Sequence, residues 1–394
     1  MVSLLYTIFE SLNLILYTLG SLLVGSTIAY VVYRCYFHPV AEYPGPFIAS
    51  ITHLWQNHGP FVRHGPDKLS ITAEEVVPLV YQKGSRMMPR TEFYYVYGAS
   101  MLNVFGMRDE NAHSIRRRLM AHSSSITSVK GMEQYLDANI QIMRGNSPNM
   151  RTSSTLCNIF DTLQQGKAIL ASLIEAKDPE TGGKPRQVDL ETEAFAFRIA
   201  GTHTTSATTS LLFYHLLHAP EIMARRVDEV AEVERSLPYL KVCMRENFRL
   251  TPVFTIPLTR RIIAPEGIMV AGRHIKQGTS VAVCNHAFHH SPDIWGASHN
   301  VFDPSRWDVP EINQRARYHM QFGLGGRQCI GKTIAQTNIY RVMRTLLPEF
   351  DSQLARESER EAVDRGEFVG KLPELISVGI SDLKEPLWVT ARTR

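Results

Sequence analysis

One segment near the C-terminus gathers the residue types that a reactive thiolate would need. From Phe322 to Gly331 it reads Phe-Gly-Leu-Gly-Gly-Arg-Gln-Cys-Ile-Gly. Its glycines allow the backbone to approach a flat ligand closely and to adopt positive φ. We expect a helix from about Ile330, whose N-terminal amides, together with nearby Arg327, would favour a thiolate at Cys329 over a thiol. The alternative interpretation is a structural cysteine beside a glycine-rich turn. The glycines stand at positions 323, 325, 326 and 331.

The same segment fits the pattern F-x-x-G-x-R-x-C-x-G at every fixed position, Gly325 and Gly331 included. It therefore resembles the haem-binding loop of the cytochrome P-450 family. The resemblance implies a heme b cofactor, iron protoporphyrin IX, with Cys329 as the axial thiolate ligand of the iron. Such a ligand pushes electron density onto the metal and promotes cleavage of dioxygen. Arg327 is suited to pairing with a haem propionate, and Phe322 can pack against the ring or shield the sulfur.

A second segment, Ala200-Gly-Thr-His-Thr-Thr205, resembles the oxygen-activating part of the long central helix of the family. By that resemblance Gly201 leaves room for dioxygen or water, and the Thr204 hydroxyl directs proton delivery. The family usually has an acid just before this threonine, where the present chain has His203. Histidine can relay protons near neutral pH, or it is a bystander here. The alternative for the hydroxyl groups is a local bond to the carbonyl four residues earlier.

Three basic side chains are candidates for contacts with the haem propionates. His113 and Arg117 share one helix face because they are four residues apart. In the family a Trp or His followed at this spacing by Arg grips the propionates. Arg260, within Pro257-Leu-Thr-Arg, matches another such contact. A solvated basic face is the alternative for the run Arg116-Arg-Arg118, and a basic face could also receive an acidic reductase.

A pair of opposite charges is expected to be structural. Glu246 and Arg249 share a helix face at a spacing of three residues and can form a salt bridge. Alone, such a pair is usually a solvated surface contact. The surrounding residues resemble the E-x-x-R helix of the family, and Phe302-Asp-Pro-Ser-Arg-Trp307 resembles its meander motif. The resemblance implies that Arg306 joins the pair in a buried network, where losing one partner would strand a buried charge.

The elements that must position these residues are mostly helices. Prolines, glycines and apolar patterns predict helices over 108–122, 190–218, 221–250 (broken at Pro220 and Pro238) and 330–347. Short strands are predicted between Ile256 and Cys284 and in the tail from Lys371. The fold class expected is therefore mainly α with small β-sheets, which agrees with the cytochrome P-450 fold.

The N-terminal segment reads as a membrane anchor. From Ser11 to Tyr33 there is no charged residue, and 23 residues suffice to cross a hydrocarbon layer as a helix. Arg34 follows, so the body is expected to stay cytoplasmic, at the endoplasmic reticulum membrane. A cleaved signal peptide and a buried core helix are the alternatives. We expect an anchor over 1–34, single-pass through 11–33, a proline-rich hinge over 35–50 and a haem-binding monooxygenase domain over 51–394.

Composition excludes several classes of function. The net charge is only +4 and the chain contains no dense Lys/Arg block, which argues against nucleic acid as a partner. The five cysteines are widely spaced without a CxxC pair, which argues against a disulfide framework or a structural zinc site. A nucleophilic cysteine hydrolase would need a base beside Cys329, and the loop offers no obvious one.

The resemblance covers nearly the whole chain in order, with local shortfalls at 57–59, 125–190 and 220–237, including the region that roofs the substrate pocket in the family. It implies a monooxygenase that inserts one oxygen atom of O2 into an apolar small molecule. Electrons would come from NADPH through a cytochrome reductase, and the sequence looks most like filamentous-fungal members, which suggests secondary metabolism. The alternatives are a truncated haem protein with impaired catalysis and a haem-thiolate isomerase or dehydratase that needs no reductase. The presence of Thr204 argues against the isomerase or dehydratase.

Overall fold

The computed structural model describes most of the chain. Its described residues are 2–43, 60–82, 88–97, 102–121, 124–144, 149–151, 163–225, 237–377 and 379–394. The predicted hinge is described only as far as Tyr43, and the shortfall at 57–59 and the cysteine at position 157 lie outside these residues. The four described cysteines form no disulfide with one another, and they stand at positions 35, 243, 284 and 329.

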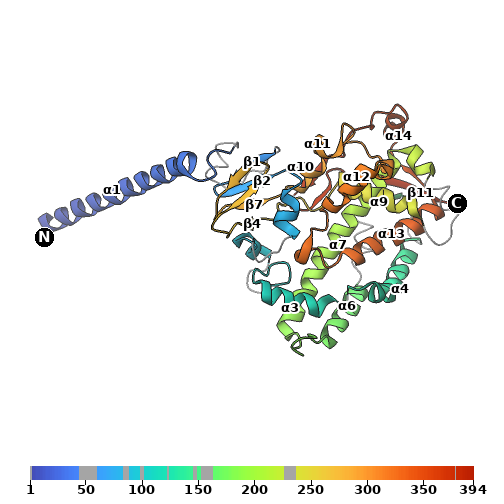
Figure 1. Cartoon of the computed structure of the whole chain (residues 1–394), viewed down its shortest axis with the longest axis horizontal. Helices are drawn as coiled ribbons and strands as arrows, with labels where there is room; N and C mark the ends of the chain where they lie inside the picture. Colours follow the sequence, from blue (N-terminus) through green and yellow to red (C-terminus); the bar gives the residue numbers. More distant parts are fainter. Residues whose placement is uncertain are drawn as a thin grey trace.

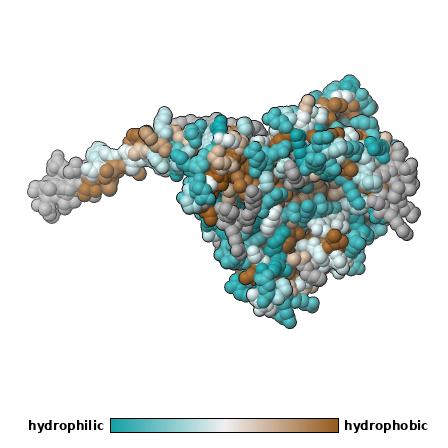
Figure 2. Space-filling view, in the orientation of Figure 1, coloured by the Kyte–Doolittle hydropathy of each residue, from teal (hydrophilic) through white to brown (hydrophobic). Residues whose placement is uncertain are grey.

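Helix α1, Val2–Val32, extends away from the rest of the molecule (Figure 1). By length and composition one helical stretch of the described residues, Ile15–Phe37, could cross a membrane. Its described side chains are mostly exposed and largely apolar (Figure 2). The hydroxyl groups of Thr18, Ser26 and Thr27 donate to carbonyls of the preceding turn. These hydroxyls are therefore hydrogen-bonded within the helix itself, which lowers the free-energy cost of transferring the helix into lipid.

The body is mainly helical, which confirms the predicted fold class. The helices predicted over 108–122, 190–218 and 330–347 are present, with bounds that differ by at most three residues. Of the predicted helix over 221–250, residues 220–225 and the segment from Pro238 are helical, and 226–236 lie outside the described residues. The longer helices are α3 (Glu110–Ala121), α4 (Ile126–Arg144), α6 (Leu163–Glu175), α7 (Gln187–Leu217), α9 (Pro238–Leu250), α13 (Lys332–Glu349) and α14 (Glu357–Asp364).

Helix α7 crosses the middle of the body (Figure 1). At its N-terminus the Asp189 carboxylate accepts from the Arg186 backbone N–H and guanidinium, and the Asp189 N–H donates to the Arg186 carbonyl. Its C-terminal half is buried although it is rich in Ser and Thr, and several of these hydroxyls bond to carbonyls of their own helix. Ser206 donates to Thr202 and Thr209 to Thr205, for example.

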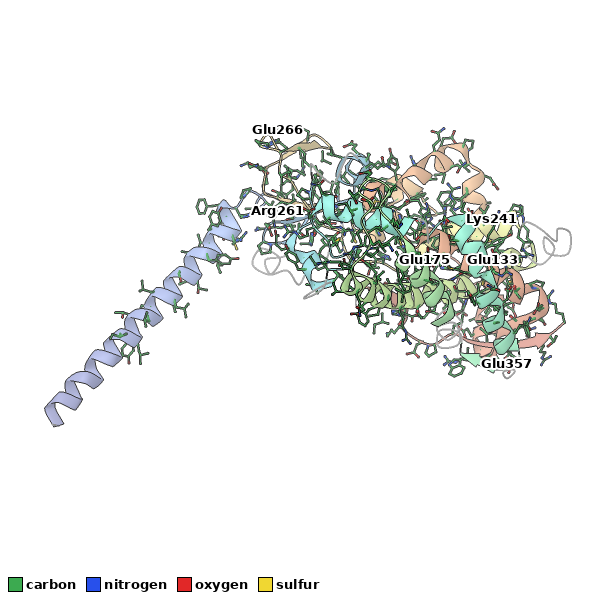
Figure 3. All side chains as sticks on the ribbon, turned by 90° about the horizontal axis from the view of Figure 1, so that it is seen from below. Glu133, Glu175, Lys241, Arg261, Glu266 and Glu357 are labelled. Atoms are coloured by element: carbon green, nitrogen blue, oxygen red, sulfur yellow. The ribbon has the colours of Figure 1, made fainter. Side chains whose placement is uncertain are left out.

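The strands form small sheets, as predicted. One mixed sheet has the order β1-β2-β7-β4, in which β2 and β7 are parallel and the other pairs are antiparallel. It lies at the end of the body from which α1 leaves, as do Arg261 and Glu266, whereas Glu357 lies at the opposite end (Figures 1 and 3). The strands of this sheet are β1 (Phe61–Gly65), β2 (Lys68–Ile71), β4 (Arg260–Arg261) and β7 (Ser280–Ala282). The others are β3 (Asn149–Arg151), β5 (Ile268–Val270), β6 (Arg273–Ile275), β8 (Phe350–Leu354), β9 (Leu375–Ser377), β10 (Ser381–Leu383) and β11 (Trp388–Thr393).

Two apolar clusters support the body. One lies among α7, α9 and α13 and includes Leu212, Phe248 and Val342, all buried. The other lies against the mixed sheet and includes Leu69 and Trp295. The segment from Phe322 to Gly331 is supported from the helical side, because Phe322 packs edge-to-face on Phe248 with ring centroids 5.2 Å apart.

Candidate active site

The cysteine loop is closed by its own backbone. The Cys329 N–H donates to the Phe322 carbonyl over 2.7 Å, and the Gln328 N–H donates to the Gly325 carbonyl over 3.0 Å. Gly331 then caps α13, which begins at Lys332. The helix therefore starts two residues later than predicted, and Cys329 stands immediately before its first turn.

The glycines of this loop differ in backbone φ and in the space that a Cβ atom would have. Gly323 and Gly325 have φ of +65° and +66°, as expected from the sequence. For Gly326 and Gly331 the expectation of positive φ was wrong, and Gly331 has φ of −81°. Gly325 is constrained twice, because a Cβ there would also lie 2.2 Å from the carbonyl oxygen of Tyr81. That carbonyl belongs to a distant segment, so the loop is shaped by tertiary packing.

Gly325→Ala is expected to lower the free energy of unfolding by about 2–4 kcal/mol, the sum of left-handed strain and an overpacked contact. The neighbouring variant Gly326→Ala is the matched control, because a Cβ at that position meets no described atom within 4 Å. It should change the free energy by no more than about 0.5 kcal/mol. Urea unfolding of the full-length chain in detergent micelles measures both. Equal effects for the two variants would contradict this account of the loop.

The Cys329 side chain is accessible to solvent and is nevertheless surrounded by protein. Burial raises the pKa of its thiol, while the N–H groups of Gly331 and Lys332 and the positive charges of Arg117 and Lys332 act in the opposite direction. The polypeptide alone therefore does not favour the thiolate, whereas coordination of a metal ion deprotonates a thiol outright. A thiol that solvent reaches remains available as a ligand to a cofactor.

Arg327 forms an ion pair within the protein, with Glu110. Its Nη2 atom lies 2.6 Å from the Glu110 carboxylate, and its Nη1 atom donates to the Met107 carbonyl over 2.8 Å. Both groups are largely buried. The propionate contact of Arg327 stays a prediction, and the structure adds a partner from within the protein, Glu110 at the start of α3. Arg327 thereby fixes the position of α3 relative to the cysteine loop.

The other three basic candidates converge on the cysteine loop. Arg117 donates from Nη1 to the Gln328 carbonyl over 2.6 Å. Arg260 is buried on β4 and donates to the hydroxyl of Tyr94 over 2.8 Å. His113 is buried on α3, and its pKa is lowered to about 3 by burial and by four nearby arginines. In the order of their effect, these are Arg327, Arg90, Arg117 and Arg260.

Arg90 also belongs to this basic cluster, which consists of His113 and the arginines at 90, 117, 260 and 327. The sequence did not indicate it. It bridges Arg260 in an antiparallel contact and is 3% exposed. Burial lowers its pKa to about 9, with the charge of Arg260 acting in the same direction. Its Nε–H finds no hydrogen-bond partner among the described residues. An isolated arginine after Pro89 carries no motif or periodicity, so only the tertiary structure reveals it.

The charge balance of this cluster calls for an anionic ligand. Against the arginines at 90, 117, 260 and 327, the described residues place one carboxylate in contact, that of Glu110, and His113 with its lowered pKa is neutral. Buried charge and an orphaned donor are costly unless a partner neutralises them. The two propionates of a haem would supply such charge beside a thiol that can bind its iron. The residues present therefore fit the cofactor that the sequence implies.

Helix α3 is also tied to α7. Arg116 contacts Asp189 over 2.7 Å and Glu193 over 3.1 Å, and burial raises the pKa of the Glu193 carboxyl to about 7. In addition, Phe197 of α7 and Ile330 of the cysteine loop pack against the same apolar cluster as Met120 of α3. The predicted oxygen-activating segment of α7 is thus held near the cysteine loop.

Within that segment the three candidates are on the accessible part of α7. The Thr204 hydroxyl donates to the Ala200 carbonyl over 2.5 Å, which is the local bond weighed as the alternative. Gly201 is exposed, and a Cβ there would meet no described atom within 4 Å. Protein packing therefore does not require glycine at this position. The His203 imidazole is 47% exposed and lies near a carboxylate from another element, Asp382.

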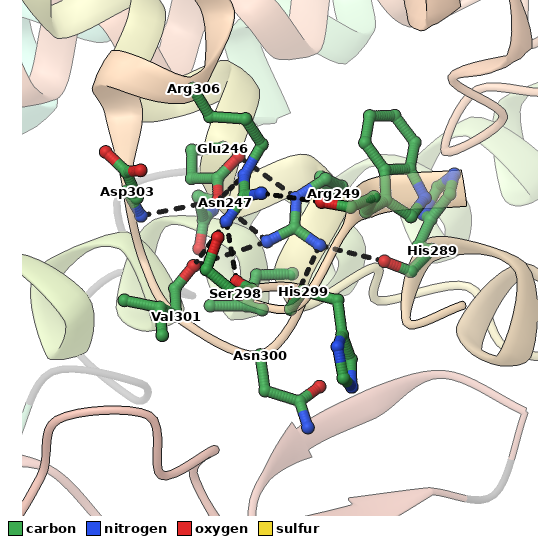
Figure 4. Close-up of polar contacts among 12 residues, drawn as sticks. Glu246, Asn247, Arg249, His289, Ser298, His299, Asn300, Val301, Asp303 and Arg306 are labelled. Carbon is green, nitrogen blue, oxygen red and sulfur yellow. Dashed lines mark hydrogen bonds and ion pairs between the residues drawn. The ribbon is translucent and has the colours of Figure 1, made fainter. Parts of the chain in front are cut away.

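Glu246, Arg249 and Arg306 form one buried network (Figure 4). Arg249 pairs with Glu246 through two nitrogens, at 3.0 and 2.7 Å, and Arg306 Nε lies 3.2 Å from the same carboxylate. The remaining guanidinium nitrogens donate to backbone carbonyls. These carbonyls belong to His289, Trp295, Ser298, His299 and Val301.

This network is connected to the cysteine loop through hydrogen bonds of His289 and Met320. It fixes the segment around His289, whose Nε2 accepts from the Met320 N–H over 3.3 Å. The Met320 carbonyl in turn accepts from Gly323, the second residue of the loop, over 2.8 Å. One carboxylate and two guanidiniums therefore hold an irregular segment in place, and the cysteine loop is built on it.

Comparison with known proteins places the chain in a family. The sequence model of the family described as cytochrome P-450 matches residues 79–380, which include the cysteine loop, the network and α7. The chain belongs to the cytochrome P-450 family. Membership makes it an oxidoreductase of the monooxygenase type, which uses haem, dioxygen and electrons from a reductase and acts on a small molecule.

Similar proteins come from filamentous fungi. The chain is 23% identical to cytochrome P-450 monooxygenase poxM of Penicillium oxalicum, over 84% of this chain and 90% of that protein. It is 24% identical to cytochrome P-450 monooxygenase cicH of Emericella nidulans, over 86% and 94%. It is 21% identical to pisatin demethylase of Fusarium vanettenii, over 84% and 88%.

The alignment with poxM has more positions than the number of residues of this chain that take part in it. It spans 461 positions, whereas 84% of 394 residues is about 330, so about 130 positions have no counterpart here. Within the predicted shortfall at 125–190 the described residues include α4, β3 and α6. The family match leaves the site elements in order, so this P-450 retains them in a shorter chain.

Proposed function

We propose that this chain is a membrane-anchored haem-thiolate monooxygenase with heme b held by Cys329. Its electrons come from an NADPH-cytochrome reductase, and it inserts one oxygen atom of O2 into an apolar small molecule of fungal secondary metabolism. The observation that carries the proposal is the solvent-accessible thiol of Cys329 beside a buried, anion-deficient cluster of arginines. The fungal relatives support the biological setting.

A haem iron with a thiolate ligand supplies the activation of dioxygen that protein side chains alone do not provide. His113, Arg117 and Arg260, with Arg90, hold the propionates and so set the orientation of the ring. Phe322 packs beside the cysteine loop, and Gly325 and Gly331 allow its path. Arg327 acts indirectly, because its pairing with Glu110 fixes α3.

The accessible part of α7 would provide the groups that handle protons. Gly201 leaves space for dioxygen, in agreement with its open surroundings. The Thr204 hydroxyl donates its own proton to Ala200 and so presents its oxygen lone pairs as a hydrogen-bond acceptor towards the site. His203, whose imidazole is exposed to solvent, supplies protons from solvent.

The proposal places the chain at the endoplasmic reticulum membrane, with the body on the cytoplasmic side. Support comes from the apolar helix and from Arg34 at its C-terminal side. On that side the body meets NADPH-dependent reductases and apolar substrates partitioned into the bilayer. The predicted divisions at 1–34, 35–50 and 51–394 belong to this proposal.

Cys329→Ser tests the proposed ligand. The variant is expected to lose the thiolate-type Soret band in the carbon-monoxide difference spectrum of the reduced protein, together with all product formation. Its free energy of unfolding without haem should change by no more than about 0.5 kcal/mol, because the thiol is accessible to solvent. Cys35→Ser, made in the segment that follows α1, is the control and should behave as wild type. A thiolate-type band that survives in Cys329→Ser would defeat the proposal.

One observation favours a second candidate, a haem protein with impaired turnover. Phe195 and Ile199 on α7 are 68% and 54% exposed, next to Gly201. Apolar side chains at a substrate site are normally covered, so a partly uncovered site would admit water and release reduced oxygen. Stoichiometric haem with electrons lost to peroxide would identify this candidate. Tight coupling of NADPH oxidation to product would exclude it.

A further inference from the structure

Asp382 on strand β10 brings a carboxylate to His203. The Asp382 Oδ2 atom lies 3.6 Å from His203 Nε2, although the two residues are far apart in the sequence. The Asp382 side chain is 21% exposed and the imidazole is 47% exposed. The histidine is therefore in contact with an acid on one side and open to solvent on the other. Catalytic contacts are often long before the reacting complex forms.

The hairpin that carries Asp382 is firmly held. Ser381 is buried and donates from its backbone N–H to the Val253 carbonyl over 2.7 Å. The Thr255 N–H donates to the Gly379 carbonyl over 3.3 Å, and its hydroxyl lies 2.7 Å from that of Ser377. The carboxylate is thus presented from a fixed backbone that also borders the half-buried segment at 253–256.

The carboxylate itself is oriented. Its Oδ1 atom accepts from the Leu383 N–H over 2.8 Å, which turns Oδ2 towards α7. The other charged groups of this hairpin, Lys384 and Glu374, pair with each other over 2.8 Å. On α7, Arg198 precedes His203 by more than one turn. Asp382 is the carboxylate that contacts the imidazole among the described residues.

We propose that Asp382 is a positioning residue that holds His203 as the proton relay for the Thr204 segment. This inference rests on the proposed monooxygenase function. The reaction consumes two protons and two electrons for each oxygen atom released as water. The reductase supplies the electrons, and the imidazole gives a proton to the site and takes another from solvent. Asp382 orients the imidazole ring of His203. A carboxylate on a strand thereby takes the place of the acid that the family usually has on the helix.

Asp382→Asn keeps the size of the side chain and removes its charge. We expect at least about a tenfold loss of product per NADPH consumed, with the missing electrons recovered as hydrogen peroxide. NADPH oxidation and haem content should stay near wild type. Asp382→Glu should restore most of the coupling. Glu374→Gln, which removes a carboxylate of the same hairpin region from an exposed pair, should leave it unchanged.

A second measurement does not depend on turnover. Nitrogen-15 NMR of the His203 ring in the full-length chain without haem reports which nitrogen carries the proton. Contact of Asp382 with Nε2 should favour the tautomer protonated at Nε2, and Asp382→Leu, which removes both acceptor oxygens, should lower the fraction of that tautomer. An unchanged tautomer overturns the inference, as does full coupling in Asp382→Asn. Failure of the proposed function is distinguishable, because it removes the thiolate-type spectrum of the wild type and leaves the NMR result intact.

Discussion

Glu246→Ala is expected to lower the free energy of unfolding by about 3–5 kcal/mol, because it leaves two guanidiniums buried without their carboxylate. Glu246 and Arg249 are completely buried and Arg306 is 5% exposed, so water cannot replace the lost partner. Urea unfolding of the full-length chain in detergent micelles measures the effect. Trp295 and Trp307, both buried beside the network, provide the fluorescence signal.

The control for this prediction is an ion pair on the surface. Glu374 and Lys384 lie 2.8 Å apart with side chains 76% and 58% exposed. Glu374→Ala should therefore cost less than about 1 kcal/mol. The network also supports the cysteine loop through His289 and Met320. Glu246→Ala is thus expected to weaken haem retention as well, and equal stability losses in the two variants would contradict a buried network.

Acidification below about pH 6.5 is expected to destabilise the fold steeply, because buried His215 and His289 and half-buried His319, in addition to His113, resist protonation. Burial lowers the pKa of His215 and of His319 to about 3, and lowers that of His289 well below its usual value. The unfolded chain binds these protons from about pH 6.5 downwards and the folded chain does not. The free energy of unfolding that His215, His289 and His319 contribute is therefore present above about pH 6.5. It is lost as the pH falls towards 3, by up to about 4 kcal/mol per pH unit for the three groups together.

His215→Phe tests the contribution of one of these groups. The aromatic ring can keep its stacking on Phe302, where the two centroids are 4.6 Å apart. The dependence of unfolding free energy on pH between 4 and 6 should then become shallower by about 1.4 kcal/mol per pH unit. His274→Phe, the same change at an exposed position of β6, should leave the slope unchanged. If the two variants have the same slope as wild type, His215 does not resist protonation.

The fold was largely predictable, since local patterns specify its elements. Glycines and prolines marked the strand region, and apolar periodicity marked α3, α7 and α13 within a few residues. The delayed start of α13 depends on Gly331 acting as its cap, which the sequence alone does not distinguish from a first helical residue. The break before α9 follows from Pro238, which occupies the first turn without needing an N–H partner.

The site was predictable where its chemistry lies in one local segment, as in the cysteine loop. It was not predictable where two distant segments meet. Arg327 pairs with Glu110, 217 residues away in the sequence, and neither segment carries a pattern that indicates this pair. The carbonyl of Tyr81 explains Gly325, and Arg90 joins Arg260 through a single backbone bridge. Such contacts depend on packing of the whole body and leave no pattern in either segment.

X-ray absorption at the iron edge is the most direct test of the central claim, that Cys329 is the iron ligand. The full-length chain, reconstituted with haem in detergent micelles, should show one sulfur neighbour in addition to the four porphyrin nitrogens. In Cys329→Ser that sulfur should be absent, whereas in Cys35→Ser it should persist. An iron without a sulfur neighbour in the wild type, or a sulfur neighbour that survives in Cys329→Ser, would contradict the account.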